Sequence, residues 1–117
     1  MGRMKDERVT LSGRTIIMGR MIAKFGGKYC EWSTVVDAPV TYLMEKDDFV
    51  DYIRQEYGKT GLVELPQRME RVELNGTSSL DGRSEKDLIR YNRAGENESR
   101  ITTQKALIER YTFKEKT

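Results

Sequence analysis

The order of apolar and polar positions predicts a strand-and-helix pattern, with one ambiguous stretch near the start. In "SGRTIIMGRMIAKFGG", residues 12–27, Ile17, Met21 and Phe25 recur every four positions. With Ser12 as a candidate cap and Gly26 as the stop, this spacing favours a helix. The same stretch also alternates as a strand that turns at the glycine pair, so the strand stays open as the alternative.

The next segment, residues 28–36, predicts a strand because aromatic and β-branched residues dominate it. We expect the strand to break at Asp37-Ala38-Pro39, since proline donates no hydrogen bond to a ladder and restricts the residue before it. Residues 40–44 then predict a short second strand.

Helical spacing dominates the rest of the chain. We expect a helix over residues 45–58 that ends at Gly58, and a second over 65–76 with Pro66 in its first turn. Ser84 and Asp87 have the spacing of a capping box. The remaining two helices are expected over residues 84–95, ending at Gly95, and over residues 102–111.

These elements add up to a helix-rich α+β domain with a small antiparallel β element near residues 28–44. The length of 117 residues suits one compact domain, which we place at residues 8–117, after a flexible lead of residues 1–7. Nothing in the chain predicts a second domain or a repeat.

Composition excludes several classes of site. The sequence has no histidine and a single cysteine, Cys30. A zinc site of the usual kind and a Ser-His or Cys-His nucleophile therefore cannot form within one chain. Because the commonest acid and base groups are missing, we expect a protein that is not an enzyme and that holds no cofactor and no metal.

Charge and hydropathy indicate which partners the protein could bind and in which compartment it is found. The chain carries 21 basic and 19 acidic residues, a formal charge of +2, so nucleic-acid binding would need a local basic patch. No apolar run reaches the length of a membrane span, and the charged start "MGRMKDER" has no secretory apolar core. We expect a cytoplasmic protein, which the lone cysteine also fits.

The stretch "EWSTVVDAPV", residues 31–40, contains the only tryptophan. In a strand, Trp32 shares its face with Cys30, so one interpretation is a core residue. The functional interpretation is a stacking platform. Trp32 with the hydroxyls of Ser33 and Thr34 would hold a base, and Asp37 would accept from a ribose hydroxyl or a base amine.

The loop "NGTSSLDGRS", residues 75–84, offers small hydrogen-bonding residues beside an arginine. Thr77, Ser78 and Arg83 could bind a phosphate or carboxylate, although an ordinary connecting loop has the same composition. In the following helix, Lys86, Arg90 and Arg93 fall on one basic stripe, which is either an anion footprint or a solvated face.

Two groups of residues resemble parts of catalytic sites. "GKT" at residues 58–60 lacks the first glycine of a phosphate-binding P-loop, because Ile53 stands there, and a helix precedes it instead of a strand. Asp37 paired with Glu31 or Asp81 could form a carboxylate pair, but nothing in the spacing puts two of them across a substrate.

Several segments together resemble small accessory proteins of tailed phages: "WSTVVDAP" at 32–39, "EYG" at 56–58, "ELP" at 64–66, "GTSS" at 76–79 and "NRAGENE" at 92–98. The resemblance covers most of the chain from Tyr29 onward. It implies a stoichiometric role in a host cell, either blocking a host protein or sequestering a nucleotide signal used in host defence.

Three functions follow as hypotheses. The first is a binding protein that captures a small anionic ligand such as a nucleotide or cyclic oligonucleotide, with its pocket at the interface of a homo-oligomer. Arg90 and Arg93 would then be outer cations. The second is an inhibitor or structural subunit that binds a host protein, for which the acidic helix around Asp47, Asp48 and Asp51 is a candidate surface. The third is a nucleic-acid-binding accessory protein that uses helix 85–94.

Overall fold

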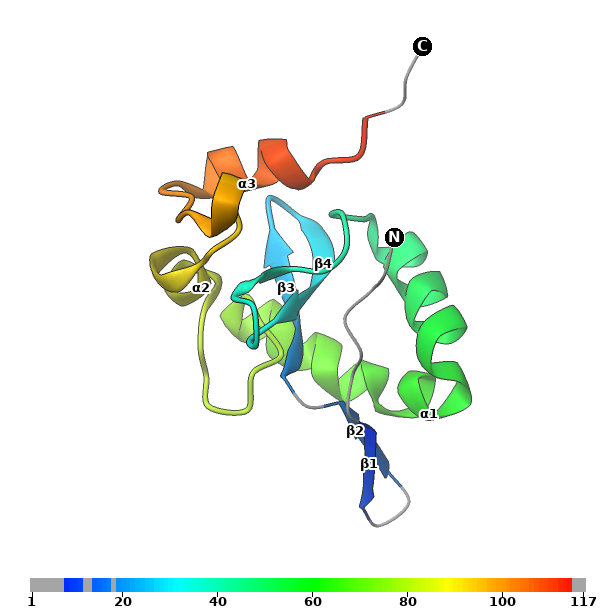
Figure 1. Ribbon diagram of the computed structural model, residues 1–117. Helices are drawn as coiled ribbons and strands as arrows, with labels where there is room; N and C mark the ends of the chain where they lie inside the picture. Colours follow the sequence, from blue (N-terminus) through cyan, green and yellow to red (C-terminus); the bar gives the residue numbers. More distant parts are fainter. Residues whose placement is uncertain (1–7, 12–13, 18, 115–117) are drawn as a thin grey trace.

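The protein is an α+β domain, as predicted, with a hairpin, a three-stranded antiparallel sheet and three helices (Figure 1). The computed structural model describes residues 8–11, 14–17 and 19–114, so the expected flexible lead and the Ser12 cap lie outside the described residues. The strands are β1 (Arg8–Leu11), β2 (Arg14–Ile17), β3 (Arg20–Phe25), β4 (Lys28–Ser33) and β5 (Ala38–Pro39). The helices are α1 (Lys46–Asn75), α2 (Glu85–Tyr91), α3 (Gln104–Tyr111) and the short 3-10 turn η1 (Glu96–Glu98).

The helix expected within residues 12–27 is wrong, and the alternative strand is what forms. β2 pairs with β1, and β3 pairs antiparallel with β4 through a turn at Gly26-Gly27, where both φ angles are positive. The spacing misled the prediction because residues four apart share one face of a helix, and they also share one face of a strand, whose period is two. The spacing of Ile17, Met21 and Phe25 therefore fits either element.

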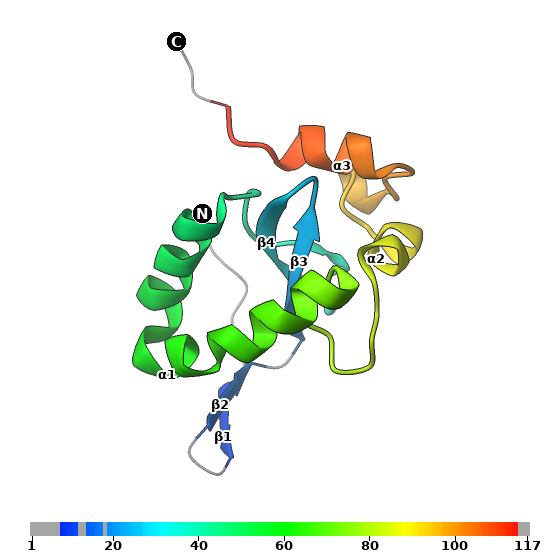
Figure 2. The same cartoon turned by 180° about the vertical axis from the view of Figure 1, so that it is seen from behind.

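Both faces of the β3–β4 hairpin are buried. Trp32 and Cys30 lie on the face covered by α2 and α3, whereas Tyr29 lies on the face covered by α1. Figures 1 and 2 show the sheet with α2 and α3 on one side and α1 on the other. The core therefore has two parts, separated by the sheet, and neither face of β4 is free for solvent.

The segment after β4 returns along it, but not as the strand expected at residues 40–44. The predicted strand 28–36 ends early, at Ser33, and a turn of residues 34–37 follows. The strand that comes next is β5, Ala38–Pro39, so Pro39 pairs with β4 where a break was predicted; Met44 adds a single bridge to Tyr29. Between them, the Thr41 side-chain oxygen accepts from the Glu31 backbone N–H at 3.1 Å. This side-chain bond replaces one rung of the ladder and explains why the regular strand is short.

The two helices expected over residues 45–58 and 65–76 are the arms of one bent helix, α1. Gly58 forms the bend with φ 63° and ψ −153°, and helical geometry resumes directly after it (Figure 1). Pro66 consequently lies inside the second arm, not in its first turn, where its missing N–H removes one helical bond. The helix ends at Gly76, as its predicted range of 65–76 implies, and this glycine has the left-handed conformation. No described helix combines the length and the apolar character needed to cross a bilayer.

The predicted capping box of α2 is confirmed, but its predicted end is wrong. The Ser84 hydroxyl accepts from the Asp87 N–H, and the Asp87 carboxylate accepts from the Ser84 N–H at 2.9 Å. The helix ends at Tyr91, four residues before Gly95, because the side chain of Asn92 makes hydrogen bonds to the backbone in place of a further helical turn. Asn92 donates to the Ile89 and Ile101 carbonyls and accepts from the Ala94 and Ile101 N–H groups.

The capping box predicts a pH-dependent stability. Hydrogen bonds from the Ser84 backbone and side chain, in that order, hold the pKa of Asp87 below its usual value. A lowered folded pKa stabilises the protein above the unfolded pKa, and this stabilisation is lost as the pH falls through the folded pKa. We expect Asp87→Asn to unfold at lower urea than the parent at pH ~7, and the difference to shrink below pH ~4. Glu85→Gln removes a charge from the same helical turn without touching the box, so an equal loss there would contradict this account.

Candidate functional site

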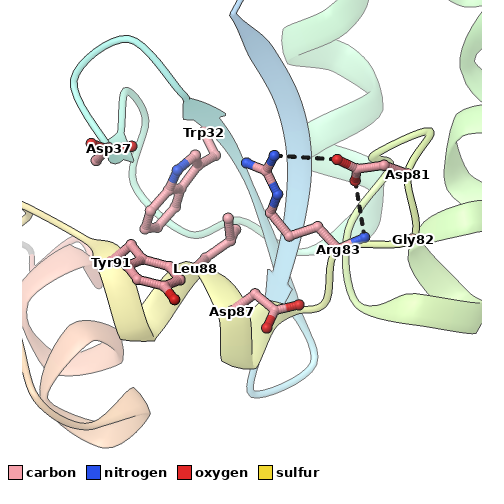
Figure 3. A pocket seen from close by; sticks show the side chains of 8 residues that line it. All are labelled: Trp32, Asp37, Asp81, Gly82, Arg83, Asp87, Leu88 and Tyr91. Carbon is pink, nitrogen blue, oxygen red and sulfur yellow. Dashed lines mark hydrogen bonds and ion pairs between the residues drawn. The ribbon is translucent and has the colours of Figure 1, made fainter.

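A pocket of about 510 Å³ opens where the end of β4 meets α2 and the loop before it (Figure 3). This volume lies in the ~300–1,000 Å³ range of small-molecule sites. Three of the residues predicted from the sequence line the pocket: Trp32, Asp37 and Arg83. The other lining residues are Asp81, Gly82, Asp87, Leu88 and Tyr91.

Trp32 is a core residue that also reaches the pocket. Its side chain is only 1% exposed, and its ring lies 5.9 Å from that of Phe25, centroid to centroid. Figure 3 shows the indole directed toward α2, where Leu88 and Tyr91 lie. Because so little of the ring is exposed, the stacking face expected from the sequence is not accessible to a ligand.

Thr77 and Ser78 are buried, and their hydroxyls serve the fold. The Ser78 hydroxyl accepts from the Ile22 N–H at 2.8 Å, and the Ser78 N–H donates to the Ile22 carbonyl at 2.9 Å. The Thr77 hydroxyl donates to the Arg83 carbonyl. These bonds attach the loop to the edge of β3 and thereby hold Arg83 beside the pocket, but neither hydroxyl lines it.

Arg83 is the cation of the pocket, and it already has a partner. Its guanidinium lies 3.3 Å from an Asp81 carboxylate oxygen, with both side chains largely exposed. A hydrogen bond from the Ser79 hydroxyl, followed by one from the Arg83 backbone, keeps the pKa of Asp81 below its usual value. Exposed ion pairs of this kind are weak, so Arg83 is available to an anion of a ligand at small cost.

Asp37 reaches the pocket from an unusual backbone position. Its φ of 57° is left-handed, and its carbonyl accepts from the Arg93 N–H at 2.8 Å, which ties this turn to the end of α2. Within the part of the chain that the structure describes, no group bonds to the Asp37 carboxylate. Non-glycine residues in this conformation often occur at functional sites.

Tyr91 is the most exposed aromatic residue among the lining residues that the sequence did not predict as ligand-binding. It belongs to the last turn of α2 and is 68% exposed, with its ring at the side of the pocket (Figure 3). The available signal was the spacing of Asp87, Leu88 and Tyr91, which puts all three on one side of a helix.

The remaining predicted residues lie outside the pocket. Ser33 is buried, and its hydroxyl accepts from the Val35 and Val36 N–H groups, while the Thr34 N–H donates to the Gly19 carbonyl. Arg90 and Arg93 are exposed. The predicted basic stripe is not one helical face, because α2 ends at Tyr91 and Arg93 lies beyond it.

The candidate catalytic carboxylates lie in two separate parts of the fold. Asp37 and Asp81 line the same pocket, whereas Glu31 lies on the other face of β4 in a buried cluster. There the Glu31 carboxylate accepts from Arg20 at 3.0 Å and from the phenols of Tyr52 and Tyr57. Burial, and then the nearby carboxylate, raise the pKa of Tyr57, so its phenol remains a donor.

The charges around the pocket limit what it can hold. Of the residues that the structure describes, one arginine and three aspartates line it, although Asp81 and Asp87 already accept several hydrogen bonds. Among the described residues, no three His, Cys, Asp or Glu side chains are grouped as metal ligands. The arrangement suits a planar ligand that offers hydrogen-bond donors and carries little negative charge. No protein family, curated protein or solved structure matches this chain.

Proposed function

We propose that this is a non-enzymatic binding protein whose pocket holds a small nucleotide. The observation that carries the proposal is the grouping of Tyr91, Asp37 and Arg83 around one pocket. The exposed Tyr91 ring would stack on the base. Asp37 would accept from a base or ribose donor, and Arg83 would bind a phosphate.

The charge of the pocket narrows the class of nucleotide. A phosphodiester carries one negative charge, whereas a terminal phosphate carries about −1.5 to −2 near neutral pH. Because the described residues that line the pocket include three aspartates and one arginine, a nucleotide with one charge per phosphate fits best. Cyclic mononucleotides and cyclic oligonucleotides meet this condition, and nucleoside triphosphates do not.

The first test is thermal unfolding with mono-, di-, tri- and cyclic nucleotides, with tryptophan fluorescence recorded in the same samples. A ligand at a hundred times its dissociation constant adds about 2.7 kcal/mol to stability. We expect a shift with cyclic nucleotides and a fluorescence change from Trp32, which lines the pocket. If no nucleotide raises the melting temperature, the proposal is wrong.

Tyr91→Ala is the variant that tests the stacking. Because the side chain is 68% exposed, its loss should leave the melting temperature of the free protein nearly unchanged. Removing the stack should weaken nucleotide binding by about 1–3 kcal/mol, measured by titration calorimetry. Tyr42→Ala is the matched control, since Tyr42 is also an exposed tyrosine, at 52%, but does not line this pocket. Equal affinity of the Tyr91 variant and the parent would exclude Tyr91 as the stacking ring.

A second candidate function is capture of a host protein, and one surface supports it. Tyr42 and Phe113 are 52% and 62% exposed and form an edge-to-face pair with ring centroids 5.5 Å apart. Exposed aromatic residues are typical anchors of protein interfaces. The acidic residues Asp47 and Asp48 are also exposed, at the start of α1. Affinity purification with and without Tyr42→Ala would test this surface separately from the pocket.

The expected context is a phage protein that sequesters a nucleotide signal in a host cell. Capture of this kind requires a stoichiometric complex and no turnover, which fits a pocket with no histidine or metal cluster in the described residues. We also propose a homo-oligomer, because a small domain gains a deep pocket most easily at a subunit interface. Light scattering with and without nucleotide gives the mass of the assembly.

A further inference from the structure

We infer that Asp37 selects the base, and that the base is guanine. The inference rests on the proposed function and goes beyond it, because it names the nucleotide from one side chain. It depends on three observations: the pocket position of Asp37, its left-handed backbone, and the absence of a partner for its carboxylate among the described residues.

The backbone alone does not explain an aspartate at position 37. A φ of 57° is best tolerated by glycine and then by asparagine or aspartate. The bond that fixes the turn is made by the Asp37 carbonyl, which accepts from the Arg93 N–H at 2.8 Å, and any residue could make it. What aspartate adds over glycine or asparagine is a charged group that only accepts hydrogen bonds.

Guanine is the base that matches such a group. Its Watson–Crick edge presents an N1–H and an N2–H side by side, so both can donate to the two oxygens of one carboxylate. Adenine and cytosine offer one exocyclic amine beside an acceptor nitrogen, which would face the carboxylate unfavourably. Paired hydrogen bonds to a charged acceptor are the strong kind.

The other two binding groups are placed to suit this base. Figure 3 shows Asp37 and Arg83 on opposite sides of the Trp32 indole, with the Tyr91 ring beside it. A base that pairs with Asp37 would therefore direct its sugar and phosphate toward Arg83. The Tyr91 ring is positioned to cover one face of the base between them.

The test compares four cyclic mononucleotides, of guanine, hypoxanthine, adenine and xanthine, on the parent and on Asp37→Asn. For the parent we expect guanine to bind about ten- to hundredfold more tightly than adenine, with hypoxanthine between because it lacks the N2 amine. Asparagine keeps the backbone geometry but can donate to the xanthine O2 while accepting from N1–H. Asp37→Asn should therefore lose guanine affinity by a similar factor and gain xanthine affinity.

The control and the outcomes separate the two proposals. Asp47→Asn makes the same charge change at an exposed position outside the pocket and should leave all four affinities unchanged. Nucleotide binding without preference for guanine, or a guanine preference that survives Asp37→Asn, would overturn the assignment of Asp37 while leaving the pocket a nucleotide site. Failure of every nucleotide to bind would overturn both.

Discussion

Glu31→Ala is expected to lower the free energy of unfolding by about 3 kcal/mol, because it removes the acceptor at the centre of a buried polar network. The Glu31 and Arg20 side chains are 1% and 3% exposed, and their charged atoms lie 3.0 Å apart. The same carboxylate accepts from two phenols in the first arm of α1, those of Tyr52 and Tyr57. The network therefore joins β4 to this arm.

The size of this effect follows from what the substitution leaves behind. A buried ion pair contributes little compared with a well-packed apolar pair, but removing one partner leaves the other charge in a poorly solvated place. The phenols of Tyr52 and Tyr57 each lose one hydrogen-bond acceptor in the same step, and each lost bond adds to the cost. Urea unfolding followed by circular dichroism measures the loss as a lower midpoint with a similar slope.

Glu70→Ala is the matched control for Glu31→Ala, because Glu70 is exposed on the second arm of α1. We expect a change within about 0.5 kcal/mol there. Tyr57→Phe removes one of the phenol bonds and should cost about 1 kcal/mol. If Glu31→Ala and Glu70→Ala unfold at the same urea concentration, the network does not hold α1 on the sheet.

Trp32→Ala is expected to cost about 3–5 kcal/mol, the range for truncating a large buried aromatic side chain. The indole is 1% exposed. It packs against Phe25 and belongs to the apolar cluster between the sheet and the two helices α2 and α3. Truncation would leave a cavity next to the pocket that Trp32 lines. Lost ligand binding in this variant would therefore report a damaged core, so Tyr91→Ala is the more direct test of the site.

Trp32→Phe separates size from aromatic character, since a phenyl ring keeps part of the contact and should cost clearly less than alanine. Val35→Ala, in the exposed turn that follows β4, is the surface control and should lie within about 0.5 kcal/mol of the parent. Differential scanning calorimetry gives all three differences. A Trp32→Ala loss no larger than that of Val35→Ala would show that the indole is not part of the core.

Local signals explain which parts of the fold were predictable. The capping box at Ser84 and Asp87 depends on residues three apart, and it formed as expected. By contrast, the end of α2 depends on Asn92, whose decisive partner is Ile101, nine residues further along. Likewise the four-residue spacing around Met21 suits either element, and only pairing with β4 decides for a strand.

The site was less predictable because it too depends on contacts between residues that are far apart in the sequence. Trp32, Asp37 and Arg83 do line one pocket, but nothing in their order along the chain shows that they meet. The hydroxyl of Ser78 suited a ligand in isolation, yet its partner is the N–H of Ile22, 56 residues away. Small polar side chains in a loop serve a fold or a ligand equally well, and only the folded chain distinguishes the two.

The burial of both faces of β4 also bears on how its pairing is specified. A slip of one residue against β3 would turn every side chain of the strand to the opposite face. Glu31 would then enter the apolar side now occupied by Trp32, away from Arg20 and the two phenols. Since an uncompensated charge in such surroundings is highly unfavourable, the single carboxylate makes the misaligned hairpin a poor competitor during folding.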